Sequence, residues 1–358
     1  MPGIIPPEFH VDIPRDRIAL YPPEKRGDSK LLVIDRSASR VVHVGPFWDI
    51  TRFVTTDLIV INETKVVPAR VFGHRVTGGS IELLFLVTSL EPQEPTQPSS
   101  ATCARVCALL STSRPPRPGT VIILPEEASF AVEGRSPHGG WEGVWTSSKG
   151  DSFEMWLDRV GVPPLPPYIK RAVEPSDREW YQTVYAEKPG SIAAPTAGLH
   201  FTNELLQQLQ QGGADIAKLT LDVGWGTFEP IKTADLTRHV MHRESFHIPE
   251  STAKAVNSAK SSARNILAVG TTSVRALEAT ALAGLPIRAG EGDANLFIYP
   301  PYKFKVVDKL LTNFHRPDST LIQLVAAMIG WDLLNEAYQR ALDEDFRFYS
   351  YGDVMLIL

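Results

Sequence analysis

The segment Lys188–Thr202, which reads KPGSIAAPTAGLHFT, combines small side chains with hydroxyl and imidazole groups. Glycine and alanine let the backbone come close to a bound molecule. Thr196 and His200 stand beside an expected helix start, where free N–H groups favour an anion or a carbonyl oxygen. The competing interpretation is a tight connection with a fully hydrogen-bonded histidine. We expect Thr196, Gly198 and His200 to belong to a substrate site.

A second segment, Leu267–Ala279, reads LAVGTTSVRALEA and predicts a buried strand followed by a turn and a helix. The hydroxyls of Thr271 and Thr272, the guanidinium of Arg275 and the first N–H groups of the helix could bind a carboxylate or a phosphate. The segment has neither a Walker loop nor a dinucleotide fingerprint. A plain strand-to-helix turn with a surface arginine is the alternative.

The third segment, Leu221–Pro230, reads LDVGWGTFEP, so a strand ends in two glycines around Trp225. A tryptophan between glycines is poorly suited to a core and could stack on a nucleic-acid base. Asp222 and Glu229 could transfer protons, and Thr227 could bind a substrate. A glycine-containing turn with a solvated glutamate is the competing interpretation.

Histidines gather in RHVMHRESFH, where His239, His242 and His247 occur. A zinc site would require a closer helical pair and a third ligand, and the HExxH motif is absent. We therefore expect no metal site and treat His242 as a group for proton transfer.

Aromatic and basic residues alternate in YKFKVVDK (Tyr302–Lys309) and TNFHRP (Thr312–Pro317). A solvated face is the usual explanation for such charge. The formal net charge is -5, so an RNA partner would need a local basic face of this kind. Four residues are expected to contact RNA phosphates: Lys303, Lys305, His315 and Arg316.

The chain of 358 residues is long enough for two domains, and its 43% hydrophobic and 22% charged residues are typical of a globular protein. The sequence shows no apolar run long enough to span a membrane and no secretory signal at its N-terminus. Cys103 and Cys107 are two nearby thiols, too few for a zinc site, and are expected to be buried in a strand. We expect a cytoplasmic protein.

Apolar runs at 31–35 and 58–62 predict strands covered on both faces. Six short strands separated by turn signals are expected at 71–76, 81–90, 102–110, 121–124, 129–135 and 142–145. A helix capped by Asp151 follows, and further helices and strands alternate from Thr202 to Leu342. The sequence thus predicts an α/β fold: a layered, discontinuous α/β domain (1–65 and 151–358) and an inserted small antiparallel β-barrel (66–150), with a mobile loop at 91–100.

These segments, in this order, resemble the S-adenosylmethionine:tRNA ribosyltransferase-isomerase (QueA) family of queuosine biosynthesis. The matching blocks are NETKVVPARVFG (62–73), YQTVYAEKPGSIAAPTAGLHFT (181–202), VGWGTFEP (223–230), MHRE (241–244), AVGTTSVRALEA (268–279), IYPPYKFKVVD (298–308), TNFHRPDSTL (312–321) and YSYGDVM (349–355). They cover nearly the whole chain outside 71–150. Several collinear blocks are far more specific than a single motif.

The resemblance implies a monomeric, cytoplasmic enzyme that needs no cofactor beyond S-adenosylmethionine as co-substrate. It implies transfer and isomerisation of the ribosyl group of this donor onto the aminomethyl group of 7-aminomethyl-7-deazaguanine in the tRNA anticodon region. The products are epoxyqueuosine in tRNA, adenine and methionine. Four residues are then expected to take part in proton transfer: His200, Asp222, Glu229 and His242. Arg275, Thr271 and Thr272 are expected to hold the methionine carboxylate.

The sequence departs from the family pattern at Lys30, Asp222, Trp225, Pro301, Arg316 and Gln323. These changes leave open a second class of function, a tRNA- or nucleotide-binding protein without turnover. A methyltransferase that uses the same donor is a further alternative, which the missing glycine-rich fingerprint disfavours.

Overall fold

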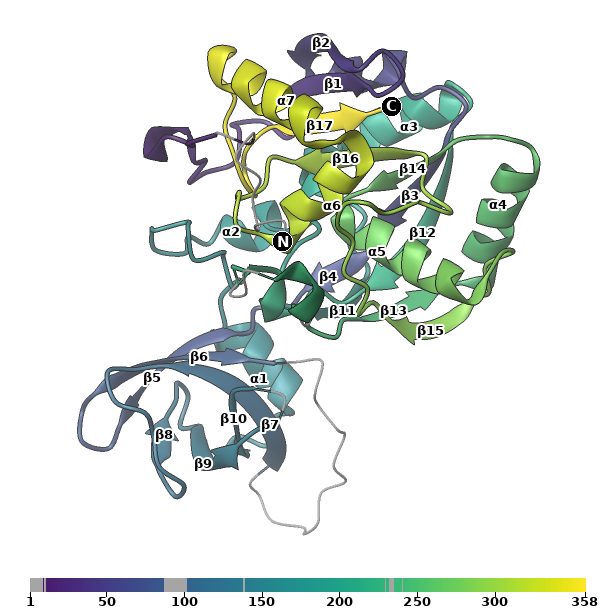
Figure 1. The fold of residues 1–358 in the computed structure, drawn as a ribbon. Coiled ribbons are helices and arrows are strands. Elements are labelled where there is room, and N and C mark those ends of the chain that lie inside the picture. The colour runs from purple at the N-terminus through teal and green to yellow at the C-terminus, as the bar shows by residue number, and fades with distance from the viewer. Residues whose placement is uncertain are drawn as a thin grey trace.

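The computed structural model describes residue 9 and residues 11–86, 102–137, 139–228, 230–231, 235–239 and 241–358. Its described part holds a mixed nine-stranded sheet flanked by helices and a closed six-stranded barrel set to one side (Figure 1). The expected fold class, α/β with an inserted small antiparallel β-barrel, is therefore confirmed. The expected mobile loop at 91–100 lies outside the described residues.

The nine-stranded sheet forms the centre of the α/β part. From edge to edge its strands are β15 (Gly290–Asp293), β13 (Ser245–Ile248), β12 (Asp215–Leu221), β3 (Leu58–Asn62), β14 (Ile266–Val269), β16 (Lys309–Asn313), β17 (Val354–Ile357), β1 (Lys30–Asp35) and β2 (Arg40–Pro46). The central strands β12, β3, β14 and β16 are parallel to one another. Strands β2, β13, β15 and β17 add antiparallel pairs.

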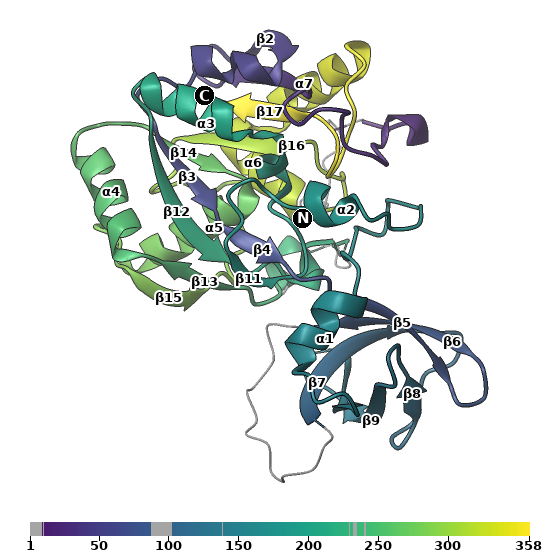
Figure 2. The ribbon, with the colours of Figure 1, turned by 180° about the vertical axis from the view of Figure 1, so that it is seen from behind.

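The apolar run of β3 is buried on both faces because the sheet lies between two layers. Leu58 and Val60 pack in the same core as helices α4 to α7, whereas Ile59 and Ile61 pack in a second core with α3 and the short helix η2. Figures 1 and 2 show α3 and α6 on opposite faces of the sheet. The long helices are α3 (Asn203–Gln211), α4 (Glu250–Ser261), α5 (Thr271–Thr280), α6 (Thr320–Ile329) and α7 (Trp331–Asp343), and η2 spans Phe47–Arg52.

The barrel has six antiparallel strands close to the six predicted ones. They are β5 (Arg70–Arg75), β6 (Ser80–Phe85), β7 (Thr102–Ser111), β8 (Val121–Ile123), β9 (Ser129–Arg135) and β10 (Trp141–Ser147). Helix α1 (Phe153–Val160) contributes Trp156 to the same core as Phe85 and Trp145. The barrel and α1 therefore share one core, which extends beyond residue 150.

The prediction that Asp151 caps α1 is wrong by one residue. The N-cap is Ser152, whose Oγ accepts the N–H of Met155 at 3.2 Å. The Asp151 carboxylate instead forms an ion pair with Arg159 at 2.5 Å. Both residue types favour the N-cap position, so the sequence alone does not separate them.

A two-stranded parallel sheet lies near the junction between the two parts (Figure 1). It pairs β4 (Thr64–Val66) with β11 (Lys188–Ser191). The chain then runs through the short helix η4 (Thr196–His200) into α3, whose N-cap is Thr202. The first segment singled out in the sequence is therefore a strand, a buried turn and a helix start. No helix among the described residues is both long and apolar enough to cross a membrane.

Candidate active site

A pocket opens where β14 and β16 end and α5 begins. Its empty volume, including the open mouth, is about 730 Å³. Its walls come from six separate parts of the chain: Tyr168, the segment 193–197, the turn with Val223, Thr227 and Pro230, the turn into α5, the segment 312–321, and Tyr349 with Ser350. In open α/β sheets, ligands bind in such crevices at the carboxyl ends of strands.

The N-terminus of α5 forms one wall of this pocket. The N-cap Gly270 has φ 84 and no side chain to cap the helix, so the first N–H groups of α5 are left without a side-chain acceptor there. Thr271 and Thr272 line the pocket and are 6% and 7% exposed. The Thr272 Oγ1 is buried and has no hydrogen-bond partner among the described residues. This wall therefore presents donors that suit a carboxylate or a phosphate.

His200 lies behind the pocket wall and is not among the residues that line it. The side chain is 3% exposed, with Nδ1 2.6 Å from Ser29 Oγ and Nε2 3.4 Å from Asn313 Nδ2. Burial, followed by the charges of Arg347 and Arg26, lowers the pKa of His200 to about 3. The imidazole is therefore neutral at physiological pH, and in this geometry it orients Asn313.

Asn313 in turn forms hydrogen bonds with two residues of the pocket wall. Its Oδ1 accepts the hydroxyl of Thr196 at 2.7 Å, and its Nδ2 donates to the carbonyl of Tyr349 at 3.2 Å. Thr196, Asn313 and Tyr349 all line the pocket. Ser29, Asn313 and Tyr349 were not predicted from the sequence as site residues, although the last two stand in blocks that match the family.

Tyr349 holds a backbone conformation that is uncommon for a non-glycine residue, with φ 72. Its ring centroid lies 4.8 Å from that of Tyr168, at an interplanar angle of 54°. The Tyr168 hydroxyl lies 2.6 Å from Ser350 Oγ, and both tyrosines line the pocket. This strained residue lines the pocket, and strained backbone conformations are common at ligand sites.

The Arg275 guanidinium forms an ion pair and a hydrogen bond inside the protein. Its side chain is 5% exposed and forms an ion pair with Glu244, whose side chain is 2% exposed. A second guanidinium nitrogen donates to the carbonyl of Ala294. Glu244 also accepts the N–H of Gly224 at 3.0 Å and the hydroxyl of Thr227 at 2.7 Å. Arg275 therefore holds the turn around Thr227 through Glu244, a site residue that was not predicted from the sequence.

A second, smaller pocket adjoins the first, since Thr227 and Leu321 line both. Arg275, Glu244 and His242 contribute to its wall. His242 is exposed and packs on Gly226, where an added Cβ would lie 2.1 Å from the imidazole Cδ2. His242 is thus the one proton-transfer candidate among the described residues that lines either pocket.

Asp222 is not among the residues lining these two pockets. Its carboxylate accepts the Thr64 hydroxyl at 2.9 Å and lies against Gly190, where an added Cβ would be 2.5 Å from Oδ1. Burial raises the pKa of Asp222, and the nearby charge of Glu244 raises it further, against the hydrogen bond from Thr64. Glu229 lies outside the described residues.

Gly198 and Trp225 also lie outside the two pockets. Gly198 is buried, and an added Cβ would be 2.0 Å from the Tyr185 hydroxyl, so this glycine serves close packing. Trp225 is half-buried and packs against a small cluster formed by Ala69, Leu84 and Ile192.

Of the four residues expected to contact RNA phosphates, two line the first pocket and two line neither pocket. His315 and Arg316 line the first pocket. His315 Nε2 lies 2.7 Å from Thr312 Oγ1, and burial lowers the pKa of His315 to about 3. Arg316 pairs with Asp318 at 2.7 Å. Both residues therefore serve the pocket wall in this geometry.

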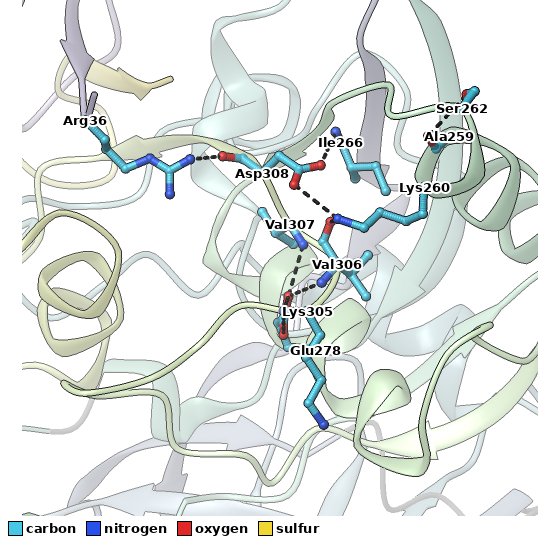
Figure 3. A network of polar contacts seen from close by, with 10 residues as sticks. All are labelled: Arg36, Ala259, Lys260, Ser262, Ile266, Glu278, Lys305, Val306, Val307 and Asp308. Atoms are coloured by element: carbon cyan, nitrogen blue, oxygen red, sulfur yellow. Dashed lines mark hydrogen bonds and ion pairs between the residues drawn. The ribbon is translucent and has the colours of Figure 1, made fainter. Parts of the chain in front are cut away.

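Lys303 and Lys305 are exposed and belong to neither pocket. The buried carboxylate of Glu278 accepts the backbone N–H groups of Lys305, Val306 and Val307, as Figure 3 shows. The Lys305 ammonium donates to the carbonyl of Ala281 at 3.3 Å. This anchor holds the segment in place before β16. Within the described part of the chain, no group of three or more His, Cys, Asp or Glu side chains could hold a metal ion.

The sequence matches the family model described as "Queuosine biosynthesis protein" over residues 7–357. The chain belongs to this family. It is 46% identical over 351 residues to the S-adenosylmethionine:tRNA ribosyltransferase-isomerase of Geobacter metallireducens, covering 98% of each chain. It is also 46% identical over 353 residues to the protein of the same name from Syntrophotalea carbinolica, covering 98% of this chain and 99% of the other.

A solved structure of the family matches along the whole length. This is the crystal structure of S-adenosylmethionine tRNA ribosyltransferase from Thermotoga maritima, with 31% identity, a TM-score of 0.53 and coverage of 98% of this chain and 100% of that chain. The resemblance drawn from the sequence blocks is therefore confirmed.

Proposed function

We propose that the chain is an S-adenosylmethionine:tRNA ribosyltransferase-isomerase. It transfers the ribosyl group of S-adenosylmethionine to the aminomethyl group of 7-aminomethyl-7-deazaguanine in tRNA and rearranges it. The products are epoxyqueuosine-tRNA, adenine and methionine. Family membership and full-length relatives with this enzyme name support the assignment.

The observation that carries the proposal is the uncapped N-terminus of α5 in the pocket. The donor's methionine carboxylate needs hydrogen-bond donors, which the α5 backbone, Thr271 and Thr272 supply. Arg275 is assigned another role, because it pairs with Glu244 and is not among the residues that line this pocket. Its role is to hold the turn that carries Thr227, so that the pocket keeps its shape. The rings of Tyr168 and Tyr349 offer an aromatic wall to the adenine.

The chemistry requires a base and an acid near the ribose. The sulfonium acidifies the adjacent ribose C–H, and departing adenine gains from protonation. His242, exposed in the adjoining pocket, is the assigned proton-transfer group. His200 is a positioning residue that acts through Asn313. The roles expected of Asp222 and Glu229 stay predictions.

S-adenosylmethionine is the co-substrate, with no further cofactor, and tRNA is bound at its anticodon region. Arg316 lines the pocket and is assigned to the RNA near the modified base, while exposed Lys303 and Lys305 remain predicted contacts to the tRNA backbone. The enzyme acts as a monomer in the cytoplasm.

The test is release of adenine from S-adenosylmethionine by the purified protein. We expect adenine with tRNA that carries the aminomethyl deazaguanine and none with tRNA that carries guanine at the same position. The product RNA should gain the mass of the rearranged ribosyl group. RNA that binds without adenine release would identify a binding protein, and methylated RNA would identify a methyltransferase; either result overturns the proposal.

A further inference from the structure

A groove separate from the two pockets lies between the barrel and the α/β part. Its empty volume, open mouth included, is about 940 Å³. The barrel contributes Leu84, Leu109, Leu110, Arg135 and Trp141, and the α/β part contributes Trp225. The groove thus combines an apolar floor with two tryptophans and an arginine.

One short turn connects this groove with the pockets. In helix η5 (Trp225–Phe228), Trp225 lines the groove, Gly226 lines the second pocket and Thr227 lines both pockets. The Cα atoms of Trp225 and Thr227 are two residues apart, which is at most about 7 Å. The groove and the pockets therefore border the same short turn.

The side chains of the groove suit a flat, unstacked base. The Arg135 guanidinium lies 4.0 Å from the centroid of the Trp141 ring, and Arg135 is exposed. A guanidinium plane can stack on a planar group such as a base. The acidic side chain of the groove, Glu82, is paired with Arg70 at 3.1 Å and so adds little repulsion toward phosphate. Aromatic rings and arginine planes are the groups on which single-stranded RNA bases stack.

We propose that this groove binds a nucleotide next to the modified one in tRNA, with its base stacked against Trp225 and Arg135. The inference rests on the proposed function, since it takes tRNA as the substrate of the neighbouring pocket. It assigns Trp225 to recognition of the RNA, and it gives the barrel a direct part in substrate binding.

The test measures coupling between Trp225 and one base of the RNA. Anticodon stem-loop RNAs carry the aminomethyl deazaguanine and are either intact or abasic at one position, immediately before or after it. Affinities are measured for the wild type, Trp225→Leu and Arg135→Gln. Phe72→Ala is the matched control, because Phe72 is an exposed aromatic residue of the barrel outside the groove.

We expect one of the two abasic positions to weaken wild-type binding about tenfold, as loss of one stacked base does. Trp225→Leu should bind intact RNA about tenfold more weakly and lose nothing further with that abasic RNA. Arg135→Gln should show a smaller effect of the same kind, and Phe72→Ala should show none. Equal abasic penalties in the wild type and Trp225→Leu, or no penalty at either position, would overturn the inference.

The failure of this inference differs from failure of the proposed function. Wild-type protein that shows the coupling but releases no adenine would refute the enzyme assignment and leave the base subsite standing. Adenine release without the coupling would support the enzyme assignment and refute the base subsite. Thermal unfolding of each variant checks the fold, and Trp225→Phe should restore part of the affinity if stacking, rather than packing, is what the tryptophan supplies.

Discussion

Replacing His200 by asparagine removes a buried imidazole whose pKa is about 3, whereas a histidine in an unfolded chain has a pKa of about 6.5. Because the folded value is the lower one, the unfolded state binds the extra proton first as the pH falls. The folded protein therefore keeps its full stability above about pH 6.5 and loses it progressively below that value. For this one group, the loss between pH 7 and pH 5 is about 2 kcal/mol, at about 1.4 kcal/mol per unit of pH.

The assay is denaturant-induced unfolding of the wild type and His200→Asn at pH 7 and pH 5, followed by near-ultraviolet circular dichroism. Asparagine can keep the contact with Ser29, so the variant should fold with a lower stability at pH 7. The remaining titrating groups are common to both proteins, so the difference between their pH dependences isolates His200. The wild type should lose about 2 kcal/mol more than the variant between the two pH values. Parallel losses would refute the claim that the buried ring stays neutral, and with it the positioning role.

Three further substitutions, and one control substitution, have expected outcomes. Glu244→Gln leaves the buried Arg275 charge without its partner and should lower the stability by about 3–5 kcal/mol, measured by thermal unfolding. Thr272→Val removes a hydroxyl that has no hydrogen-bond partner within the described protein, so the melting temperature should stay unchanged. The KM for S-adenosylmethionine should rise about tenfold, because the donor loses one hydrogen bond. An unchanged KM would argue against carboxylate binding at α5. Gly198→Ala forces a Cβ against a buried hydroxyl and should cost about 1–3 kcal/mol, whereas Gly134→Ala, which meets nothing within 4 Å, should unfold at nearly the wild-type temperature.

Much of the fold follows from the sequence because its signals are local. The runs at Leu31–Asp35 and Leu58–Asn62 are apolar at every core position, and glycine turns separate the barrel strands. The edge strand β15, with the sequence GEGD, carries no such signal. It is a strand because its backbone pairs with β13, and that partner is distant in the chain.

The segments of the site could be found from residue types, but the roles of single residues could not. Small residues and threonines led to the prediction that Thr196, Thr271 and Thr272 bind substrate, and in the structure all three line one pocket. The environments of His200 and Arg275 depend on long-range contacts, since Ser29 lies 171 residues from His200. The sequence shows that a histidine or an arginine is present, but it does not show which distant group forms a hydrogen bond or ion pair with that side chain.

Glu244 connects helix α5 with the turn η5 through its carboxylate. One carboxylate pairs with Arg275 in α5 and accepts the hydroxyl of Thr227, and Thr227 follows Trp225 closely in η5. The helix that presents donors to the pocket and the turn that borders the groove are therefore held by the same buried group. A base stacked on Trp225 would stabilise the turn in the position that shapes the pocket. On the proposed function, recognition of RNA and binding of the donor would act on one set of hydrogen bonds, which would give a reason for a charged pair at a buried site where desolvation opposes it.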